Sequence, residues 1–285
     1  MAQTVKIISD STCDLSKDLL EKYDISILPL HILLGETEYR DGVDITPEEI
    51  FRWSDENKTT PKTSAPSMTE AMEVMKPFLD EGREIICFSI SDSMSTSGNV
   101  MRLAAEELEA SDKVTVINSA NLSTGIGLQV IQAALLSAEG KTRAQITAAI
   151  EEIRPRVRAS FTVDTLTYLY RGGRCNAVAA LAGTMLKLHP RIVVEDGAMD
   201  ASKKYRGKLS SVILSYTKDM EDDLKNAVPD RVFITHSGCD REIVESVRSY
   251  LESLGIFNEI LETRAGGFIS SHCGPGTLGV LFIEK

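Results

Sequence analysis

Two loops rich in hydroxyl side chains are the segments of this sequence best suited to chemistry. Five hydroxyls lie within residues 91–97, directly after an apolar run that predicts a buried strand, and Thr63 and Ser64 lie in a second loop ahead of a predicted helix. Open α/β sheets bind ligands at the carboxyl ends of their strands, where helix starts offer free N–H groups. The pattern suits a small anion such as a carboxylate, although N-capping is the simpler account of any one hydroxyl alone.

Nucleophilic catalysis by Ser93 or Ser95 is the enzymatic alternative. An α/β hydrolase places its serine in G-x-S-x-G at a strand-to-helix turn, and the loop lacks that motif. His236 and His272 are the candidate bases. A hydrolase acting on a lipid or an acyl ester therefore remains open at this stage.

Cofactor and metal motifs are absent or incomplete. The phosphate-binding motif G-x-x-x-x-G-K-[ST] does not occur, and Gly125 and Gly127 are followed by Val130 where a dinucleotide fingerprint needs its third glycine. The four histidines have no ligand-like spacing. We expect no catalytic residue, no metal and no cofactor.

Composition narrows the class of protein. The 285 residues carry 31 Lys and Arg against 42 Asp and Glu, a formal charge of -11, which disfavours nucleic acid as a partner. The first residues lack the features of a signal peptide, and residues 122–138 are too short and polar to span a bilayer, so we expect a cytoplasmic protein. The five cysteines include no C-x-x-C pair, which argues against disulfides and structural zinc.

Strands and helices alternate in the first half of the chain, which predicts a parallel sheet with helices on both faces. Asp14 and Thr46 are predicted helix caps, and a polar loop is expected over residues 58–66. The predicted strands are residues 5–9, 26–34, 84–90 and 114–118. The predicted helices are residues 14–23, those starting near 46 and 67, and residues 97–109, 122–138 and 143–153.

The second half of the chain combines a predicted hairpin with helices, which predicts an α+β domain. It contains a hairpin around Asp196-Gly197 and a tight basic turn at residues 171–174. Helices are expected over residues 176–188, 209–226 and 240–254, and strands over residues 159–163 and 231–236 and in two closing segments. The fold class is thus α/β with two domains, residues 1–156 and 157–285. The short linker predicts that they pack together and enclose a cleft.

Short motifs along the whole chain resemble those of the DegV family, bacterial fatty-acid-binding proteins that present lipid to a fatty acid kinase. The motifs occur in the family's order, and each is weak alone. They are ISDSTCDL at residues 8–15, DGVDI at 41–45, KTSAPS at 62–67, ISDSMS at 90–95, DTLTYLYRGGR at 164–174, KYRG at 204–207 and HCGPGTLG at 272–279.

The resemblance implies a tunnel between the domains that holds one fatty acid, such as palmitate, stearate or oleate. It implies that Thr63 and Ser95 bind the carboxylate with His272 close by, and that Ser64 and Thr96 contribute through backbone N–H groups. It further implies no catalysis by this chain, a separate fatty acid kinase as partner, and a place in phospholipid metabolism. The family has basic residues near the opening of the tunnel, which are expected to contact the partner or a membrane surface. They correspond in this sequence to Arg171, Arg174 and Arg206.

This sequence departs from the family pattern at Ala65, Met94 and Thr96, and Thr96 stands next to Ser95 where the family usually has glycine. Residues 122–136 and 177–188, with Met185 and Leu186, are candidate linings for the lipid tail. About 14 buried methylenes at about 0.8 kcal/mol each would dominate affinity. An enzyme related to dihydroxyacetone kinase is a further alternative, weakened by the missing ATP motif. A transcriptional or structural role is a third, and the acidic charge disfavours DNA contact.

Overall fold

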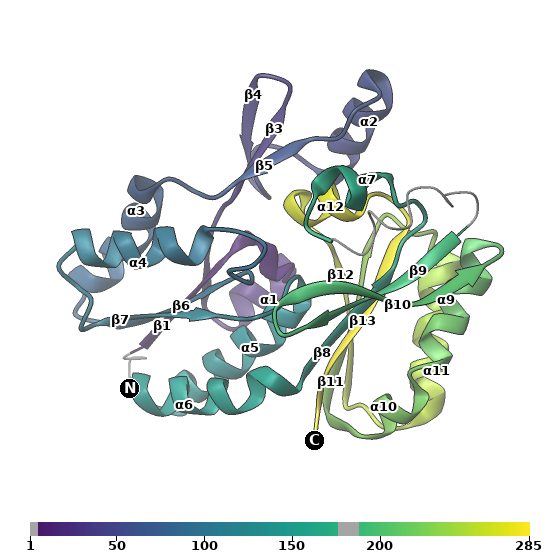
Figure 1. The fold of residues 1–285 in the computed structure, drawn as a ribbon. Coiled ribbons are helices and arrows are strands. Elements are labelled where there is room, and N and C mark those ends of the chain that lie inside the picture. Colours follow the sequence, from purple (N-terminus) through teal and green to yellow (C-terminus); the bar gives the residue numbers. More distant parts are fainter. Residues whose placement is uncertain (1–4, 176–187) are drawn as a thin grey trace.

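A four-stranded parallel sheet forms the first part of the computed structural model, which describes residues 5–175 and 188–285 (Figure 1). Its strand order is β2-β1-β6-β7, and the two central strands are almost wholly buried, as strands covered on both faces must be. The strands are β1 (Val5–Asp10), β2 (Ile25–Leu28), β6 (Glu84–Ser89) and β7 (Val114–Asn118).

Helices cover both faces of this sheet, so the predicted three-layer arrangement is confirmed (Figure 1). On one face, α3 (Met68–Asp80) and α4 (Ser97–Glu107) pack against each other and against β6. On the other face, α5 (Thr124–Ala138) packs on β1 and α6 (Arg143–Ile153) packs on β6. The short α1 (Lys17–Lys22) precedes β2.

Side-chain caps begin several helices of the first part. Thr46 opens α2 (Pro47–Asn57) and Ser67 opens α3, each with a complete capping box. The predicted cap at Asp14 is wrong, because Ser16 caps α1. Asp14 follows a single 3₁₀ turn (Ser11–Cys13), adopts a left-handed conformation with φ of 51°, and is buried.

A small antiparallel sheet of order β4-β3-β5 lies beside the parallel one. Its strands are β3 (His31–Leu34), β4 (Thr37–Arg40) and β5 (Lys62–Ser64). The single strand predicted over residues 26–34 is therefore wrong: β2 and β3 belong to different sheets, and Pro29, which has no N–H to donate, lies between them. The predicted polar loop also contains β5, in which Thr63 pairs with Ile32.

A six-stranded sheet of order β10-β9-β8-β13-β11-β12 dominates the second part. All neighbours are antiparallel except β11 and β12. The predicted β9–β10 hairpin is confirmed, and its turn residues Asp196 and Gly197 both have positive φ, as a type I′ turn requires. The strands are β8 (Val157–Thr162), β9 (Leu188–Glu195), β10 (Ala198–Arg206), β11 (Ala227–Ser237), β12 (Glu259–Arg264) and β13 (Thr277–Glu284).

Three helices cover one face of this sheet around the buried Tyr216: α9 (Leu209–Lys218), α10 (Glu221–Lys225) and α11 (Arg241–Leu254). The single helix predicted over residues 209–226 is in fact two, α9 and α10. Of the helix predicted over residues 176–188, all but Leu188 lies outside the described residues, and Leu188 begins β9.

Two short helices pack against each other where the parts meet: α7 (Thr167–Gly172) and α12 (Gly267–Cys273). The predicted basic turn is thus the last turn of α7, which includes Arg171 and ends at Gly173 with φ of 66°. Helix α12 was not predicted.

The two parts share one hydrophobic cluster. Helix α5 of the first part packs on β8 and β13 of the second, so apolar side chains are continuous from β1 to β13. The six-stranded sheet begins at Val157, but the division into residues 1–156 and 157–285 stays a prediction. Over the described residues, every helix falls short of the length and apolar character needed to cross a membrane.

Candidate functional site

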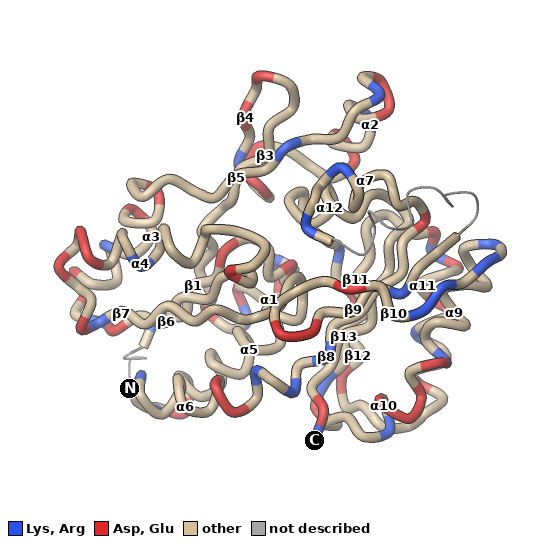
Figure 2. Tube along the Cα trace, in the orientation of Figure 1, with Lys and Arg blue, Asp and Glu red and all other residues tan. Residues whose placement is uncertain are grey.

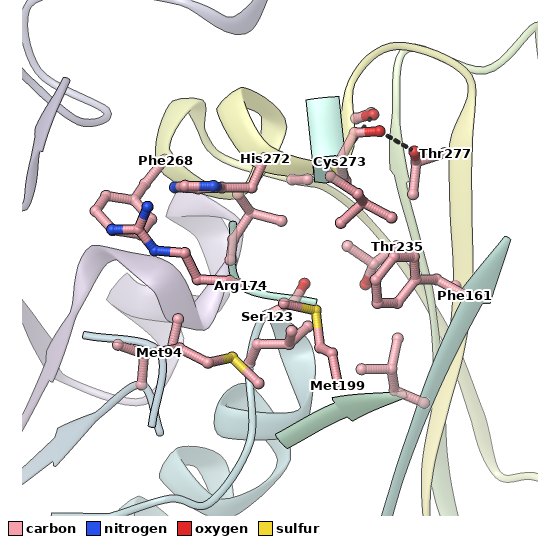
Figure 3. Close-up of a pocket in the computed structure, with 18 of the residues that line it drawn as sticks. Met94, Ser123, Phe161, Arg174, Met199, Thr235, Phe268, His272, Cys273 and Thr277 are labelled. Atoms are coloured by element: carbon pink, nitrogen blue, oxygen red, sulfur yellow. Dashed lines mark hydrogen bonds between the residues drawn. The ribbon is translucent and has the colours of Figure 1, made fainter. Parts of the chain in front are cut away.

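A narrow cavity lies between the two parts (Figure 3). Its volume is about 60 Å³. A space this narrow suits a thin, flexible ligand. Apolar side chains from both parts make most of the wall, among them Met94, Leu122, Phe161, Met199, Phe268 and Leu281.

Hydroxyl groups in the cavity wall are directed toward protein acceptors. Ser123 Oγ donates to Asp14 Oδ2 at 2.5 Å, and Thr277 Oγ1 donates to the Cys273 carbonyl at 2.9 Å. Ser237 Oγ donates to the Gly274 carbonyl. Since these protons are already committed, the three oxygens offer only lone pairs to a ligand and would repel a carboxylate.

His272 lines one end of the cavity, and Thr235 and Thr277 lie across from it (Figure 3). Helix α12 carries it and packs on β3 and β5, which brings His272 Nε2 to 2.8 Å from Thr63 Oγ1. Burial, together with the positive charge of Arg174, lowers the pKa of His272 to about 4. The ring is therefore neutral at pH 7, and its Nδ1 has no hydrogen-bond partner among the described residues.

Arg174 lies beside His272 and lines the same end of the cavity while remaining exposed to solvent. Its Nη1 donates to the Gly172 carbonyl at 2.6 Å, which leaves other guanidinium N–H groups available. A Cβ at Gly172 would lie 2.5 Å from His272 Nδ1, so glycine is needed there to seat the imidazole ring. This end of the cavity thus combines a positive charge with unused hydrogen-bonding capacity.

The remaining predicted carboxylate ligands are not joined to Thr63 or His272 by any described hydrogen bond. Ser64 is half-buried in β5 opposite His31. Ser95 Oγ accepts from the Ser97 N–H at 3.2 Å, and Thr96 is exposed at the start of α4 without a side-chain capping bond. Their roles stay predictions.

Arg171 and Arg206 are exposed and do not line the cavity. Arg206 ends β10, an edge strand in which Lys and Arg residues gather on this otherwise acidic protein (Figure 2). Contact of these two residues with a partner stays a prediction.

Ser91 and Ser93 hold the β9–β10 hairpin in place. Both hydroxyls donate to the Gly197 carbonyl, at 2.6 Å and 2.5 Å. No described hydrogen bond pairs a serine of this loop with a histidine, so the contacts do not favour a nucleophilic serine.

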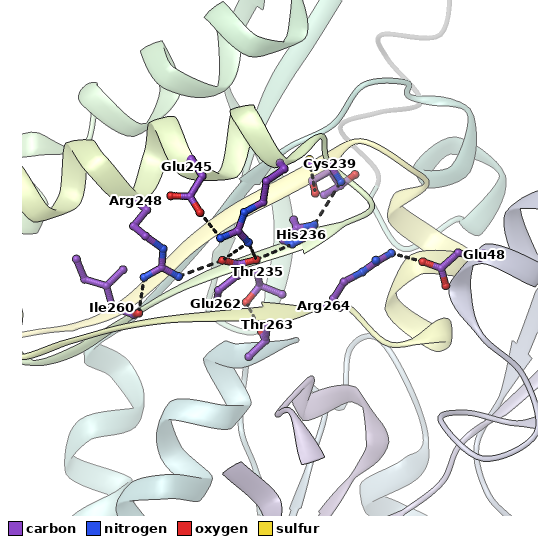
Figure 4. Close-up of polar contacts among 12 residues, drawn as sticks. Glu48, Thr235, His236, Cys239, Glu245, Arg248, Ile260, Glu262, Thr263 and Arg264 are labelled. Carbon is purple, nitrogen blue, oxygen red and sulfur yellow. Dashed lines mark hydrogen bonds and ion pairs between the residues drawn. The ribbon is translucent and has the colours of Figure 1, made fainter. Parts of the chain in front are cut away.

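His236, the other candidate base, belongs to a network of charged residues on β11 and β12 (Figure 4). Its Nδ1 accepts from the Cys239 N–H at 3.3 Å, and its Nε2 lies 3.6 Å from a Glu262 oxygen that Arg241 also contacts. Burial, with the positive charge of Arg264, lowers the pKa of His236. Arg264 also pairs with Glu48 and so ties β12 to α2.

Three buried aspartates, to which the sequence analysis assigned no site role, brace the cavity. Asp14 accepts from the Gly266 N–H at 2.8 Å, just before α12, besides accepting from Ser123. Asp41 accepts from Ser11 Oγ at 2.7 Å and faces the first N–H groups of α12. Asp10 accepts from the Ile90 N–H and from Ser97 Oγ. Two of these carboxyl groups therefore position the helix that carries His272. In the sequence, the only sign of such a role is that aspartates and hydroxyl residues alternate directly after the first buried strand.

Asp41 should make stability depend on pH. Burial raises its pKa to about 6, against about 3.9 in an unfolded chain. Because the native state then binds more protons, the free energy of unfolding should fall by about 3 kcal/mol between about pH 4 and pH 6. Urea unfolding at several pH values should show a shallower fall for Asp41→Asn, with Asp10 and Asp14 supplying the rest in the same direction. Equal slopes for variant and wild type would refute this role.

The fold and the site together define an α/β protein with an enclosed, mainly apolar cavity that is polar and positively charged at one end. Across the described residues, no group of His, Cys, Asp and Glu is arranged to hold a metal ion. The chain belongs to the DegV family: the model of that family, described as an uncharacterised protein, matches residues 4–285.

Relatives of similar length support this assignment. A DegV domain-containing protein of Clostridium perfringens is 32% identical, covering 99% of each chain. A Thermus thermophilus structure, described as fatty acid binding of a DegV family protein, is 31% identical with a TM-score of 0.91 and covers 99% of this chain and 100% of that one. A stearic acid-binding protein of Eubacterium ventriosum is 32% identical with a TM-score of 0.85 and covers 99% of this chain and 98% of that one.

Proposed function

We propose that this protein encloses one long-chain fatty acid, with the carboxylate at His272 and the tail between the two parts. The observation that carries the proposal is the asymmetry of the cavity. One end has a guanidinium group and a neutral imidazole whose Nδ1 has no partner among the described residues, whereas most of the remaining wall is apolar. The fatty acid binding described for the Thermus thermophilus and Eubacterium ventriosum relatives supports the same class of ligand.

The tail supplies most of the affinity. Each buried methylene contributes about 0.8 kcal/mol before binding entropy is subtracted, whereas a neutral hydrogen bond nets about 1 kcal/mol. The head-group contacts therefore chiefly fix orientation. A buried carboxylate without donors is costly, so at least two donors must reach it.

The donors available to the carboxylate are the Thr63 hydroxyl, the neutral His272 ring and the Arg174 guanidinium. The first two share one hydrogen bond of 2.8 Å, which uses one of their two protons, so the pair donates a single hydrogen bond to the anion. We place that donor at Thr63, with the neutral ring donating from Nε2 to Thr63 Oγ1. Ser95 through its hydroxyl, and Ser64 and Thr96 through backbone N–H groups, complete the proposed set. No base is required, because a carboxylate is already ionised at pH 7.

The protein is further proposed to act as a carrier and not as an enzyme. It would hold the carboxylate at the cavity mouth in the cytoplasm for a separate fatty acid kinase. There a carboxylate oxygen attacks the γ-phosphorus of ATP, ADP leaves, and an acyl phosphate for phospholipid synthesis forms. Arg171, Arg174 and Arg206 are the proposed contacts with the kinase or with an anionic membrane surface, which their positive charge suits.

Thr63→Ala should weaken stearate binding about tenfold, because the carboxylate loses one hydrogen bond. It should lower kinase-dependent phosphorylation further, since the head group is no longer held in one pose. Isothermal titration with stearate and a coupled ATP assay measure the two effects. Thr69→Ala, at an exposed position of α3, is the matched control. Unchanged affinity and unchanged phosphorylation in Thr63→Ala would remove Thr63 from the site.

A further inference from the structure

Hydroxyl side chains occupy part of the cavity wall where the strand pattern calls for apolar ones. Thr235 and Ser237 of β11 lie on one face of the sheet, and Thr277 of β13 pairs with Ser237 on that face. Further along the same face, Phe233 and Leu281 are apolar and buried in the shared core. The hydroxyls thus form a local polar patch in a cavity wall whose other side chains are mostly apolar and suited to a hydrocarbon tail.

Thr235 is the centre of a chain of three buried threonines. Its Oγ1 lies 2.6 Å from Thr124 Oγ1 and 3.0 Å from Thr263 Oγ1. All three side chains are at most 5% exposed. Three hydroxyls carry three protons, and the two hydrogen bonds between them use only two. One proton therefore has no acceptor among the described residues.

A ligand atom in the cavity can accept a hydrogen bond from that proton. Thr235 lines the cavity, whereas Thr124 and Thr263 do not. When both neighbours donate to Thr235, its own proton is free to point into the cavity. A buried donor without a partner is costly, and a plain hydrocarbon tail offers it none. An oxygen atom on the tail would accept from Thr235.

A hydroxyl on the tail would also donate. Ser237 and Thr277 present lone pairs beside Thr235 because their protons are bound to backbone carbonyls. The patch thus offers one donor and several acceptors, which is the complement of a neutral hydroxyl group. A carboxylate, which only accepts and is charged, fits these lone pairs poorly.

We propose that the protein takes fatty acids that carry a hydroxyl group along the chain, received at Thr235 between Ser237 and Thr277. The inference rests on the proposed function, since the carboxylate must be held at the His272 end for the chain to reach this patch. It names a narrower ligand class for the same cavity.

Competition binding distinguishes a preference for hydroxylated fatty acids from the binding of plain fatty acids alone. Wild-type protein is titrated with stearic acid and with a positional series of hydroxystearic acids. The expected result is that at least one isomer binds as tightly as stearic acid or more tightly, where an apolar pocket would weaken every isomer by about tenfold or more. Failure of stearic acid to bind would overturn the proposed function itself.

Three variants tie the preference to Thr235. Thr235→Val should lower the affinity ratio of the best hydroxy acid to stearic acid by about fivefold to tenfold, the effect of one hydrogen bond. Thr235→Ser should keep the ratio, because it keeps the hydroxyl. Thr162→Val, a buried β8 position outside the cavity wall, should leave it unchanged.

Stearic acid binding confirms in each case that the variant is folded. The inference is overturned if every hydroxy isomer binds wild type more weakly than stearic acid. It is also overturned if Thr235→Val leaves the ratio as it is.

Discussion

Met199→Trp should reduce stearate affinity about 50-fold while the protein remains folded. Met199 lies on β10, is only half-buried, and lines the narrow cavity from the second part. An indole ring there would occupy the path of the tail and displace about three methylenes. At about 0.8 kcal/mol each, their loss costs about 2.4 kcal/mol. Because β10 is an edge strand, the sheet has room to accept the larger side chain.

Met68→Trp is the matched control for this variant. Met68 is exposed on α3, away from the cavity wall, so the same exchange there should leave affinity unchanged. Circular dichroism and titration with stearate would be measured on both proteins. Full affinity in a folded Met199→Trp protein would mean that the tail lies elsewhere.

Asp14→Ala should lower the free energy of unfolding by about 3 to 4 kcal/mol. The change leaves Ser123 Oγ and the Gly266 N–H without their acceptor in a buried setting, at about 1 to 3 kcal/mol each. Affinity for stearate should fall as well, because Gly266 begins the turn into α12 and thereby sets the position of His272. Urea unfolding and titration with stearate measure the two effects.

Two further variants show whether the carboxyl group acts through these bonds. Burial raises the pKa of Asp14 well above its usual value, so a neutral amide is a close substitute, and Asp14→Asn should lose much less stability than Asp14→Ala. Asp18→Ala, on the exposed side of α1, should change stability by less than about 0.5 kcal/mol. Equal losses for Asp14→Ala and Asp14→Asn would contradict the role given to the acceptor.

Local rules predicted much of the parallel-sheet part because its signals lie close together in the chain. The capping boxes at Thr46 and Ser67 each span four residues, and the structure begins α2 and α3 where they indicate. Residues 114–118 and 143–153 match β7 and α6 without correction. The hairpin at Asp196-Gly197 follows from turn chemistry alone.

The errors occur where a distant partner decides the structure. Asp14 reads as a helix cap, yet its partner Gly266 lies 252 positions away in the sequence. The polar residues of β5 become a strand because β3 pairs with them. Helix α12 is only seven residues long, with Gly266 as its N-cap and Gly267 as its first residue, so no periodicity reveals it.

The roles given to the site residues stay predictions, but one contact between them is present. Thr63 and His272 come from the family resemblance, and the structure brings them together although 209 positions separate them. The third proton of the threonine chain could not be found from the sequence, because it depends on how Thr124, Thr235 and Thr263 converge from a helix and two strands.

Native mass spectrometry of protein purified from cells, followed by lipid extraction, tests the central claim most directly. We expect one long-chain fatty acid of about 14 to 18 carbons, plain or hydroxylated, per protein chain. Thr63→Ala and Met199→Trp should carry less of it. A lipid-free protein that also fails to take up added stearate would contradict the account.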